Sequence, residues 1–315
     1  MYTHIFGPVP SRRLGMSLGV DLVYHKVCSL DCIYCECGKT TRLTLERKEY
    51  VPIESVLGEL KDYFSRHPDP DYITFSGSGE PTLSNGIGDV IRFIKQAKPG
   101  VKVAVLTNGT LLHQSQVRQE LLLADVVIPS LDSALISSFK TVNRPAKGLD
   151  LETYIQGIQD FRNEYMGRLL LEVFILPGVN DSSLDLDALA CAVDRIRPDS
   201  VQLNTLDRPG TEPGIRAATR ENLENIARIF GNRPVEIIAS GPARKPGPAF
   251  RNDMESAILE TIHRRPCTAR DLASVLGIHT REIDKCLDLL DRAGKIQVTR
   301  LPRGIFYATK KPAED

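Results

Sequence analysis

Three thiols stand close together in the stretch Cys28-Ser29-Leu30-Asp31-Cys32-Ile33-Tyr34-Cys35, at C-x3-C-x2-C spacing. Thiolates with this spacing can hold a soft metal centre from a single loop. Three of them do not complete a tetrahedral structural zinc site, because such a site takes four ligands. A four-iron cluster held by three cysteines would leave one iron open, and that iron could bind a substrate or cofactor.

A zinc site is the alternative, with Cys37 as the fourth ligand beside Cys28, Cys32 and Cys35. Cys37 stands only two residues beyond Cys35, which disfavours it as a ligand and leaves it as a free thiol near the site. Cys191 falls among the apolar residues of a predicted helix, so we expect it to be buried. The remaining two cysteines, Cys267 and Cys286, are expected to be structural.

Length and composition indicate an ordinary globular protein. The chain has 315 residues, 42% of them hydrophobic and 25% charged, which suits one large domain and one small domain. No apolar run approaches the ~18 residues needed to cross a bilayer, and no secretory signal is visible. Seven cysteines, four of them between positions 28 and 37, do not form a disulfide framework. We therefore expect a cytoplasmic protein without a membrane partner.

Strand-like and helix-like stretches alternate through most of the chain. A helical stripe begins at Ile53, and strands are predicted at 19–24 and from about Tyr72, Lys102, Asp125, Leu169, Ser200 and Val235. This alternation predicts an α/β fold with a parallel sheet and right-handed crossovers. Six strand–helix units suggest an open barrel rather than a closed one of eight. The segment 7–15, rich in glycine and proline, is predicted to form turns.

A small domain is predicted at the C-terminal end. Residues 1–240 form the large domain, and 241–250, rich in proline and glycine, read as a linker. Within 251–315, three helices at 254–262, 269–276 and 281–293 precede a hairpin at 295–299 and 304–308. This order resembles a winged helix-turn-helix. The third helix carries four acids against three bases, and the chain as a whole has 40 basic and 40 acidic residues. Neither number supports a DNA-binding surface.

Polar turns follow the predicted strands, where parallel α/β sheets bind their ligands. The turn Ser76-Gly77-Ser78-Gly79-Glu80-Pro81-Thr82 comes after the second strand, and its glycines would let backbone carbonyls approach a ligand. Later turns contain Asn108, the pair Ser130 and Asp132, and Arg144. Such residues also cap helices and form turns routinely. Glu172 lies within a strand, where an unpaired carboxylate would be costly, and Asn204 and Asp207 are candidates for a substrate side.

The cysteine stretch resembles the cluster-binding signature of the radical S-adenosylmethionine (radical SAM) superfamily. The resemblance implies a partial (β/α)6 TIM-like barrel with the small winged-helix domain appended. It implies a 4Fe-4S cluster on Cys28, Cys32 and Cys35, whose free iron takes the amino and carboxylate groups of S-adenosylmethionine (SAM). Tyr34 would lie against the adenine. The remaining cofactor contacts would come from Gly77, Ser78, Gly79, Glu80, Asn108, Ser130, Asp132 and Arg144, with Glu80 fixing the amino group.

The implied reaction begins with an electron from a donor such as flavodoxin or ferredoxin. SAM is then cleaved to methionine and a 5′-deoxyadenosyl radical, which abstracts hydrogen from a substrate. The protein positions the cofactor, and the cofactor carries the difficult chemistry. The alternative function is a non-catalytic iron–sulfur or zinc protein that acts as a winged-helix regulator.

A second resemblance concerns the substrate. Residues 7–15 (GPVPSRRLG) and 18–22 (LGVDL) are similar to a bacterial and archaeal radical SAM group related to the wybutosine-type tRNA synthases. This similarity implies tRNA modification, with tRNA or a protein held through the C-terminal domain. No cysteine precedes Cys28, so the second cluster of those synthases has no ligands upstream in this sequence. The expected RNA contacts are Arg12, Arg13, Arg300 and Arg303.

Overall fold

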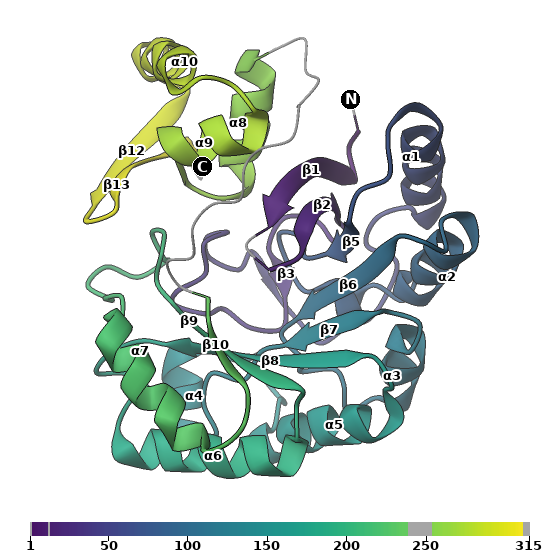
Figure 1. Cartoon of the computed structure of the whole chain (residues 1–315), viewed down its shortest axis with the longest axis vertical. Coiled ribbons are helices and arrows are strands. Elements are labelled where there is room, and N and C mark those ends of the chain that lie inside the picture. Colours follow the sequence, from purple (N-terminus) through teal and green to yellow (C-terminus); the bar gives the residue numbers. More distant parts are fainter. Residues whose placement is uncertain (1, 12, 239–253, 311–315) are drawn as a thin grey trace.

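An open eight-stranded sheet forms the centre of the molecule (Figure 1). The computed structural model describes residues 2–11, 13–238 and 254–310. Strand order across the sheet is β1-β2-β5-β6-β7-β8-β9-β10; β1 is antiparallel to β2, and every other neighbouring pair is parallel. The strands are β1 (Ile5–Ser11), β2 (Gly15–Val20), β5 (Tyr72–Phe75), β6 (Lys102–Thr107), β7 (Val126–Pro129), β8 (Arg168–Ile175), β9 (Ser200–Thr205) and β10 (Val235–Ile237).

Helices follow the strands in alternation, giving six strand–helix units and then the short β10. They are α1 (Ile53–Arg66), α2 (Ile87–Ala97), α3 (Ser115–Leu121), α4 (Ile136–Val142), α5 (Leu151–Glu164), α6 (Ser183–Ile196) and α7 (Arg220–Ala227), with 3-10 turns η1 (Pro81–Leu83) and η2 (Arg228–Phe230). Each turns an apolar stripe to the sheet. In α2, for example, Val90, Ile91 and Ile94 are fully buried and share the main core with Val103 and Val105 of β6.

Most of the predicted strands are confirmed. β5, β6, β9 and β10 begin at the predicted residues, and β7 and β8 begin within one residue of them. The N-terminal prediction was wrong, because residues 7–11 of the segment predicted as turns belong to β1 and the first parallel strand, predicted at 19–24, is Gly15–Val20. β1 is an edge strand, where residues without an N–H, such as Pro8 and Pro10, are tolerated.

The C-terminal residues form a second, smaller body with a core of its own. We call residues 254–310 the C-terminal unit; its helices are α8 (Met254–Arg264), α9 (Ala269–Leu276) and α10 (Thr280–Arg292). Its strands, β11 (Cys267–Thr268), β12 (Ile296–Leu301) and β13 (Gly304–Thr309), pair in the order β11-β13-β12. The helices and hairpin predicted from the sequence are therefore present. The proposed linker at 241–250 lies outside the described residues.

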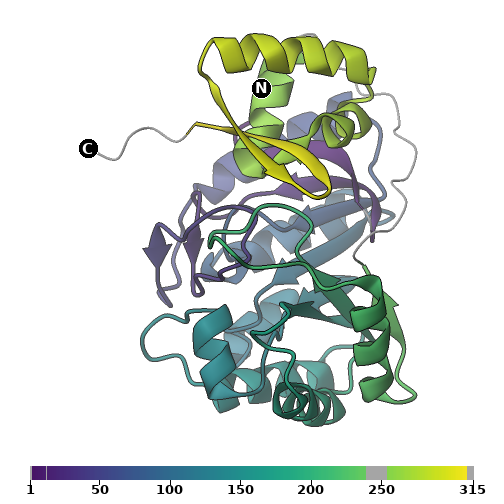
Figure 2. The same cartoon turned by 90° about the vertical axis from the view of Figure 1, so that its left-hand side faces the viewer.

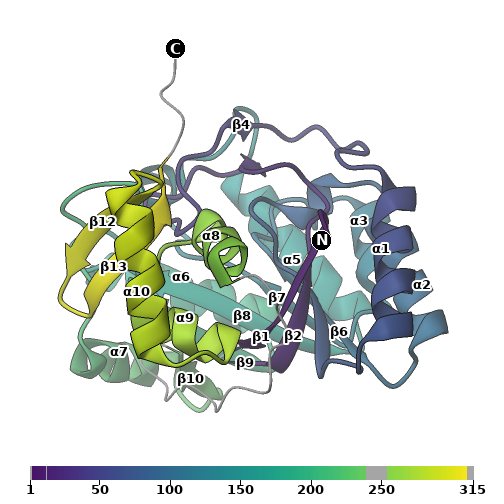
Figure 3. The same ribbon diagram turned by 90° about the horizontal axis from the view of Figure 1, so that it is seen from above.

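The C-terminal unit lies on the side of β1 and β2, away from α5 and α6 (Figure 2). α9 contacts β1, and the view from above shows the unit beside the β1–β2 hairpin (Figure 3). Cys267 and Cys286 are buried, as expected, whereas Cys191 is exposed and its predicted burial was wrong. α6 buries Leu189, Ala192 and Val193, which leaves Cys191 on its outer face. None of the described helices is long and apolar enough to cross a membrane.

Candidate metal centre

The cysteine loop follows β2 and is bracketed by two short paired strands, β3 (Val27–Cys28) and β4 (Arg42–Leu43). Each of the three predicted ligand sulfurs receives a hydrogen bond from a side-chain nitrogen: Cys28 from Asn108 Nδ2 at 3.5 Å, Cys32 from Asn143 Nδ2 at 3.3 Å, and Cys35 from Lys26 Nζ at 3.0 Å. Donors of this kind stabilise thiolates and orient them. The loop thus offers three sulfurs, each already held by the protein.

Burial and charge act differently on the thiols. Burial raises the pKa of Cys28 to about 12 and also raises the pKa of Cys32. The pKa of Cys35 is lowered, because the thiol of Cys37 donates a hydrogen bond to it and the Lys26 ammonium lies beside it, which together outweigh burial. Burial would lower the pKa of Lys26, but the neighbouring sulfurs, Cys35 first among them, raise it overall. Lys26 is therefore a buried cation whose counter-charge is Cys35.

The donor set fits an iron–sulfur cluster better than a single zinc ion. A zinc ion would need its sulfur ligands at about 2.3 Å from one point. Within the described residues, no three Cys, His, Asp or Glu side chains are arranged to hold one ion. Cys37, the fourth ligand of the zinc alternative, hydrogen-bonds to Cys35 instead. A 4Fe-4S cluster places its cysteines on separate irons, which suits three individually supported sulfurs from one loop.

The glycine-rich turn packs directly against the chain that leads into the cysteine loop. A Cβ at Gly77 would lie 2.0 Å from Asp21 Oδ1, and one at Gly79 would lie 2.2 Å from the carbonyl oxygen of Val27. Any side chain at these positions would force the two segments apart. The glycines are therefore required for the close approach of this turn.

Glu80 is held from within the protein. Its Oε1 accepts hydrogen bonds from Thr107 Oγ1 at 2.6 Å and from the amide and hydroxyl of Thr82 at 3.0 and 2.6 Å, while Oε2 accepts the amide of Asn108 at 2.6 Å. The residue is 2% exposed, and burial raises the pKa of its carboxyl although the hydrogen bonds oppose this effect. The carboxylate thus fixes two turns to each other, and a ligand contact in this segment would come through its backbone.

Tyr34 and Asp132 belong to a second internal network. The Tyr34 ring stacks on Phe174 with centroids 3.8 Å apart, and its hydroxyl donates to Asp132 Oδ2 at 2.6 Å. Asp132 also accepts from Asn143 Nδ2 at 2.6 Å and from the amide of Phe174 at 2.9 Å. Burial raises the pKa of Asp132 to about 6, against the effect of these hydrogen bonds. Since Asn143 also donates to Cys32, Asp132 orients groups around the loop from a buried position.

Two further predicted residues lie in different surroundings. Ser130 accepts the hydroxyl of Tyr154 on its backbone carbonyl, beside the turn that contains Asn108. Arg144 has a left-handed backbone (φ 44°), and its Nη1 donates to Glu212 Oε1 at 2.6 Å. Its side chain is 41% exposed. The carboxylate partner predicted for Arg144 is thus supplied by Glu212 in this structure.

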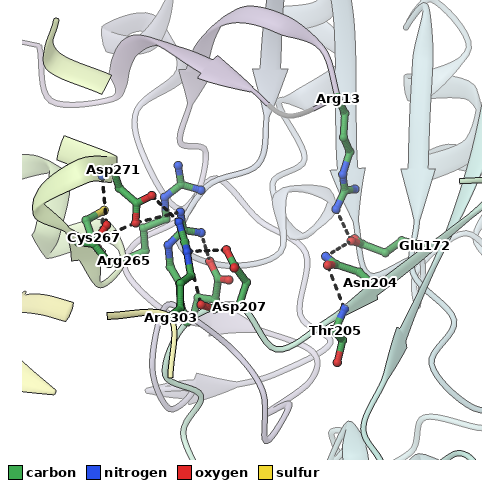
Figure 4. Close-up of polar contacts among 12 residues, drawn as sticks. Arg13, Glu172, Asn204, Thr205, Asp207, Arg265, Cys267, Asp271 and Arg303 are labelled. Carbon is green, nitrogen blue, oxygen red and sulfur yellow. Dashed lines mark hydrogen bonds and ion pairs between the residues drawn. The ribbon is translucent and has the colours of Figure 1, made fainter. Parts of the chain in front are cut away.

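Several predicted charges are already paired (Figure 4). Arg13 pairs with Glu172, which also accepts from Asn204 Nδ2 at 3.0 Å, so this strand carboxylate is not isolated. Arg303 pairs with Asp207 and Asp271. Arg13 and Arg303 are therefore not the free RNA contacts that the sequence suggested, Arg300 is exposed, and Arg12 lies outside the described residues.

Two hollows of about 390 and 360 Å³ lie elsewhere. One is lined by Ala190, Asp194 and residues 229–233, and the other by His113 and residues of α5. Neither contains a predicted site residue. Nothing in the sequence indicated the roles of Lys26 and Arg208. Lys26 reaches Cys35 through a left-handed backbone conformation, and Arg208 pairs with Glu36, 172 positions away.

Comparison with known proteins gives the family and agrees with the fold. The family model of the radical SAM superfamily matches residues 22–190, more than half of the chain. The chain belongs to the radical SAM superfamily. Members of this superfamily are enzymes that bind a 4Fe-4S cluster and SAM, and these are the cofactors of this chain.

Among its relatives, a UPF0026 protein of Methanocaldococcus jannaschii is 30% identical over 321 residues, 99% of this chain and 98% of that protein. A protein of Brachyspira hyodysenteriae named GTPase Obg is 35% identical over 305 residues; the match covers 96% of this chain but 45% of that relative's length. A GTP 3′,8-cyclase of Alkaliphilus oremlandii is 28% identical over 225 residues, 69% of this chain and 65% of that enzyme.

Solved structures show the same fold. A radical SAM methyltransferase from Sphaerobacter thermophilus superposes with a TM-score of 0.52 at 18% identity, covering 70% of this chain and 66% of that one. SuiB from Streptococcus suis, solved with S-adenosylmethionine bound, superposes with a TM-score of 0.51 at 14% identity, covering 70% of this chain and 49% of that one.

Proposed function

We propose that Cys28, Cys32 and Cys35 hold the 4Fe-4S cluster and that its open iron takes the amino and carboxylate groups of SAM. The observation that carries this proposal is the donor set, in which each sulfur already has its own nitrogen donor. When bound and reduced, the cluster supplies the electron that cleaves SAM to methionine and a 5′-deoxyadenosyl radical, which takes a hydrogen atom from the substrate.

The chain's own residues bind and orient the cofactor in this proposal. The backbone of 77–79 receives the amino group, and Glu80 keeps that backbone in place. Tyr34, fixed by Phe174 and Asp132, presents its ring to the adenine. Polar groups at Asn108, Ser130 and Arg144 line the remainder of the site. Arg144 exchanges Glu212 for the cofactor carboxylate, which a guanidinium can bind in bidentate fashion.

Formation of 5′-deoxyadenosine tests the proposal. The protein is reconstituted anaerobically, reduced with dithionite and incubated with SAM, and the products are separated by chromatography. Wild-type protein should form 5′-deoxyadenosine and Cys32→Ala should form none. Cys286→Ala, which removes a buried thiol of the C-terminal unit, should retain the reaction. A cluster-loaded wild-type protein that forms no 5′-deoxyadenosine would exclude the proposed chemistry.

We propose a nucleobase-containing substrate, with an electron donor of the flavodoxin or ferredoxin type. Support comes from the similarity to GTP 3′,8-cyclases and from the N-terminal resemblance to wybutosine-type tRNA synthases. The internal pairing of Arg13 and Arg303 favours a small nucleotide over a whole tRNA. Filter retention of labelled nucleotides and of total tRNA, at about 50 mM salt where electrostatic binding is strong, separates the two. If the protein retains neither the nucleotides nor the tRNA, the substrate is not a nucleobase compound and belongs to another class.

We propose the winged-helix fold for the C-terminal unit, on the order of three helices followed by a hairpin. Its α10 exposes acids that would repel phosphate, which disfavours the regulator alternative. A role within the enzyme suits this unit better than DNA binding.

A further inference from the structure

Charged side chains join the C-terminal unit to the rest of the protein. Its core is separate from the main core. Between the two run the ion pairs Arg264–Asp21, Arg303–Asp207 and, at 3.9 Å, Arg208–Asp271. Figure 4 shows Arg303 beside Asp207. The unit contributes Arg264, Asp271 and Arg303, so both signs of charge come from each side. On the side of the main domain, Asp21 also contacts the glycine-rich turn and Arg208 also contacts the cysteine loop. We assign these two segments to the cofactors.

The first of these links runs through Asp21. Arg264 lies over the ring of Phe6, 3.8 Å from its centroid, and its Nη1 pairs with Asp21 Oδ2. The other oxygen of Asp21 accepts the amide of Ser78 at 3.3 Å and lies against the Cα of Gly77. A single carboxylate therefore joins α8 to the glycine-rich turn. If Arg264 were lost, the carboxylate of Asp21, whose side chain is 13% exposed, would keep its hydrogen bond with the turn but lose its counter-charge.

The second link runs through Arg208, in the segment that follows β9. Its Nη1 donates to Glu36 Oε2 at 2.9 Å, and its Nη2 lies 3.9 Å from Asp271 Oδ2. Glu36 stands between Cys35 and Cys37 in the cysteine loop. The Arg208 side chain is only 8% exposed, and a guanidinium so deeply buried requires carboxylate partners. The cysteine loop and α9 are thus held by the same cation.

We infer that the C-terminal unit positions both cofactor segments: Arg264 acts through Asp21 on the glycine-rich turn, and Asp271 acts through Arg208 on the cysteine loop. These are positioning residues, since each acts on a cofactor segment through another side chain. The inference rests on the proposed function for the roles of the two segments. Displacement of the unit would loosen both at once, so SAM affinity and cluster retention depend on its docking.

The turn is tested with Arg264→Met, which keeps an apolar stem over Phe6 but removes the charge, and with Arg264→Lys, which restores the charge. Arg233→Met is the matched control, because Arg233 is similarly exposed (29% against 25%) and pairs with Asp194. The first readout is amide hydrogen exchange of residues 76–80 in the cofactor-free protein. The second is SAM affinity of the reconstituted protein by calorimetry.

Arg264→Met should speed exchange across 76–80 and weaken SAM about tenfold, the scale of a lost supporting contact. Arg264→Lys should recover part of both, and Arg233→Met should change neither. If Arg264→Met does not fold, Asp21→Asn breaks the same pair with the side-chain shape kept and should also speed exchange. If Arg264→Met or Asp21→Asn is folded and residues 76–80 exchange at the wild-type rate, the C-terminal unit does not position the glycine-rich turn.

The cysteine loop is tested with Asp271→Asn, which removes the charge of the C-terminal unit beside Arg208 and should lose iron to a chelator several times faster than wild type. Iron loss at the wild-type rate overturns the inference for the loop. Amide hydrogen exchange is measured on the cofactor-free protein. The positioning role of the C-terminal unit can therefore fail without the proposed function failing, and the reverse also holds. If the wild-type protein never binds SAM, the proposed function is refuted. If Arg264→Met and Asp21→Asn bind SAM as tightly as wild type, only the positioning role is refuted.

Discussion

Glu80 Oε2 accepts the backbone amide of Asn108 at 2.6 Å, which joins the turn after β5 to the turn after β6. The side chain of Asn108 then reaches Cys28 Sγ at 3.5 Å. A buried carboxylate and a proposed cluster cysteine are therefore connected through one residue. Glu80, only 2% exposed, can thus act on the proposed cofactor site through Asn108.

Glu80→Gln should lower the free energy of unfolding of the cofactor-free protein by about 1–3 kcal/mol, because an amide NH2 would face donors that now bind a carboxylate. SAM affinity should fall as well, because the turn loses its support. Urea titration and calorimetry measure the two effects. Glu59→Gln is the matched control: Glu59 accepts the amides of residues 3–5, so its loss should change stability alone. Equal SAM affinity in both variants would refute the role given to Glu80.

Iron content should separate the four clustered cysteines. Alanine at Cys28, Cys32 or Cys35 should abolish the cluster, and Cys37→Ala should retain about four irons per chain. The reason is that Cys37 donates a hydrogen bond to Cys35 and is not itself among the predicted ligands. Iron and sulfide analysis after anaerobic reconstitution gives the answer. Loss of iron in Cys37→Ala, with zinc in the wild type, would favour the four-cysteine zinc site.

Lys26→Met should lower the reduction potential of the cluster. The Lys26 ammonium is buried and donates to Cys35 at 3.0 Å, so it favours the more negative, reduced state. A shift of roughly 60 mV would correspond to a tenfold change in a one-electron equilibrium. Lys39→Met is the control, because the Lys39 side chain is 66% exposed and its charge is screened by solvent. Equal potentials in the two variants would show that Lys26 does not act on the cluster.

Glu172 should give the unfolding free energy a specific pH dependence. Burial alone would raise the pKa of its carboxyl, but the charge and hydrogen bond of Arg13, with the amide of Asn204, hold that pKa below its ordinary value. A lowered folded-state pKa stabilises the protein above the ordinary carboxyl value and loses that contribution as the pH falls through the folded one.

Glu172→Gln should therefore be less stable than wild type by about 1–3 kcal/mol at pH 7, and the difference should narrow as the pH falls below about 4.5. Urea unfolding at several pH values measures it, with Glu224→Gln, an exposed partner of Arg220, as control. A difference that grows toward acid pH would contradict the pairing.

The sequence predicted the parallel strands well because buried strands are nearly continuous apolar runs, as in Val103–Leu106 of β6. It failed at β1, where prolines and glycines indicate turns unless the strand is known to lie at a sheet edge. The three proposed cluster cysteines could be picked out because they stand within eight residues of one another. Their supporting donors could not: Asn143 is 111 positions from Cys32, and only the fold brings them together.

The same limit applies to charges. Arg13 and Arg303 were predicted to be free for RNA because a sequence shows a charge without its partner. Their partners, Glu172 and Asp207, are 159 and 96 positions away. Lys26 has a left-handed backbone (φ 58°) that brings it back toward Cys35. No local pattern records such a conformation in a lysine.

We have proposed that Cys28, Cys32 and Cys35 hold a cluster with one iron open to SAM. Electron paramagnetic resonance of the reduced, anaerobically reconstituted protein, recorded without and with SAM, tests it most directly. We expect a 4Fe-4S signal whose spectrum changes when SAM is added, and no such signal in Cys32→Ala. A wild-type protein with tightly bound zinc and no iron signal, or a cluster spectrum that SAM leaves unchanged, would contradict it.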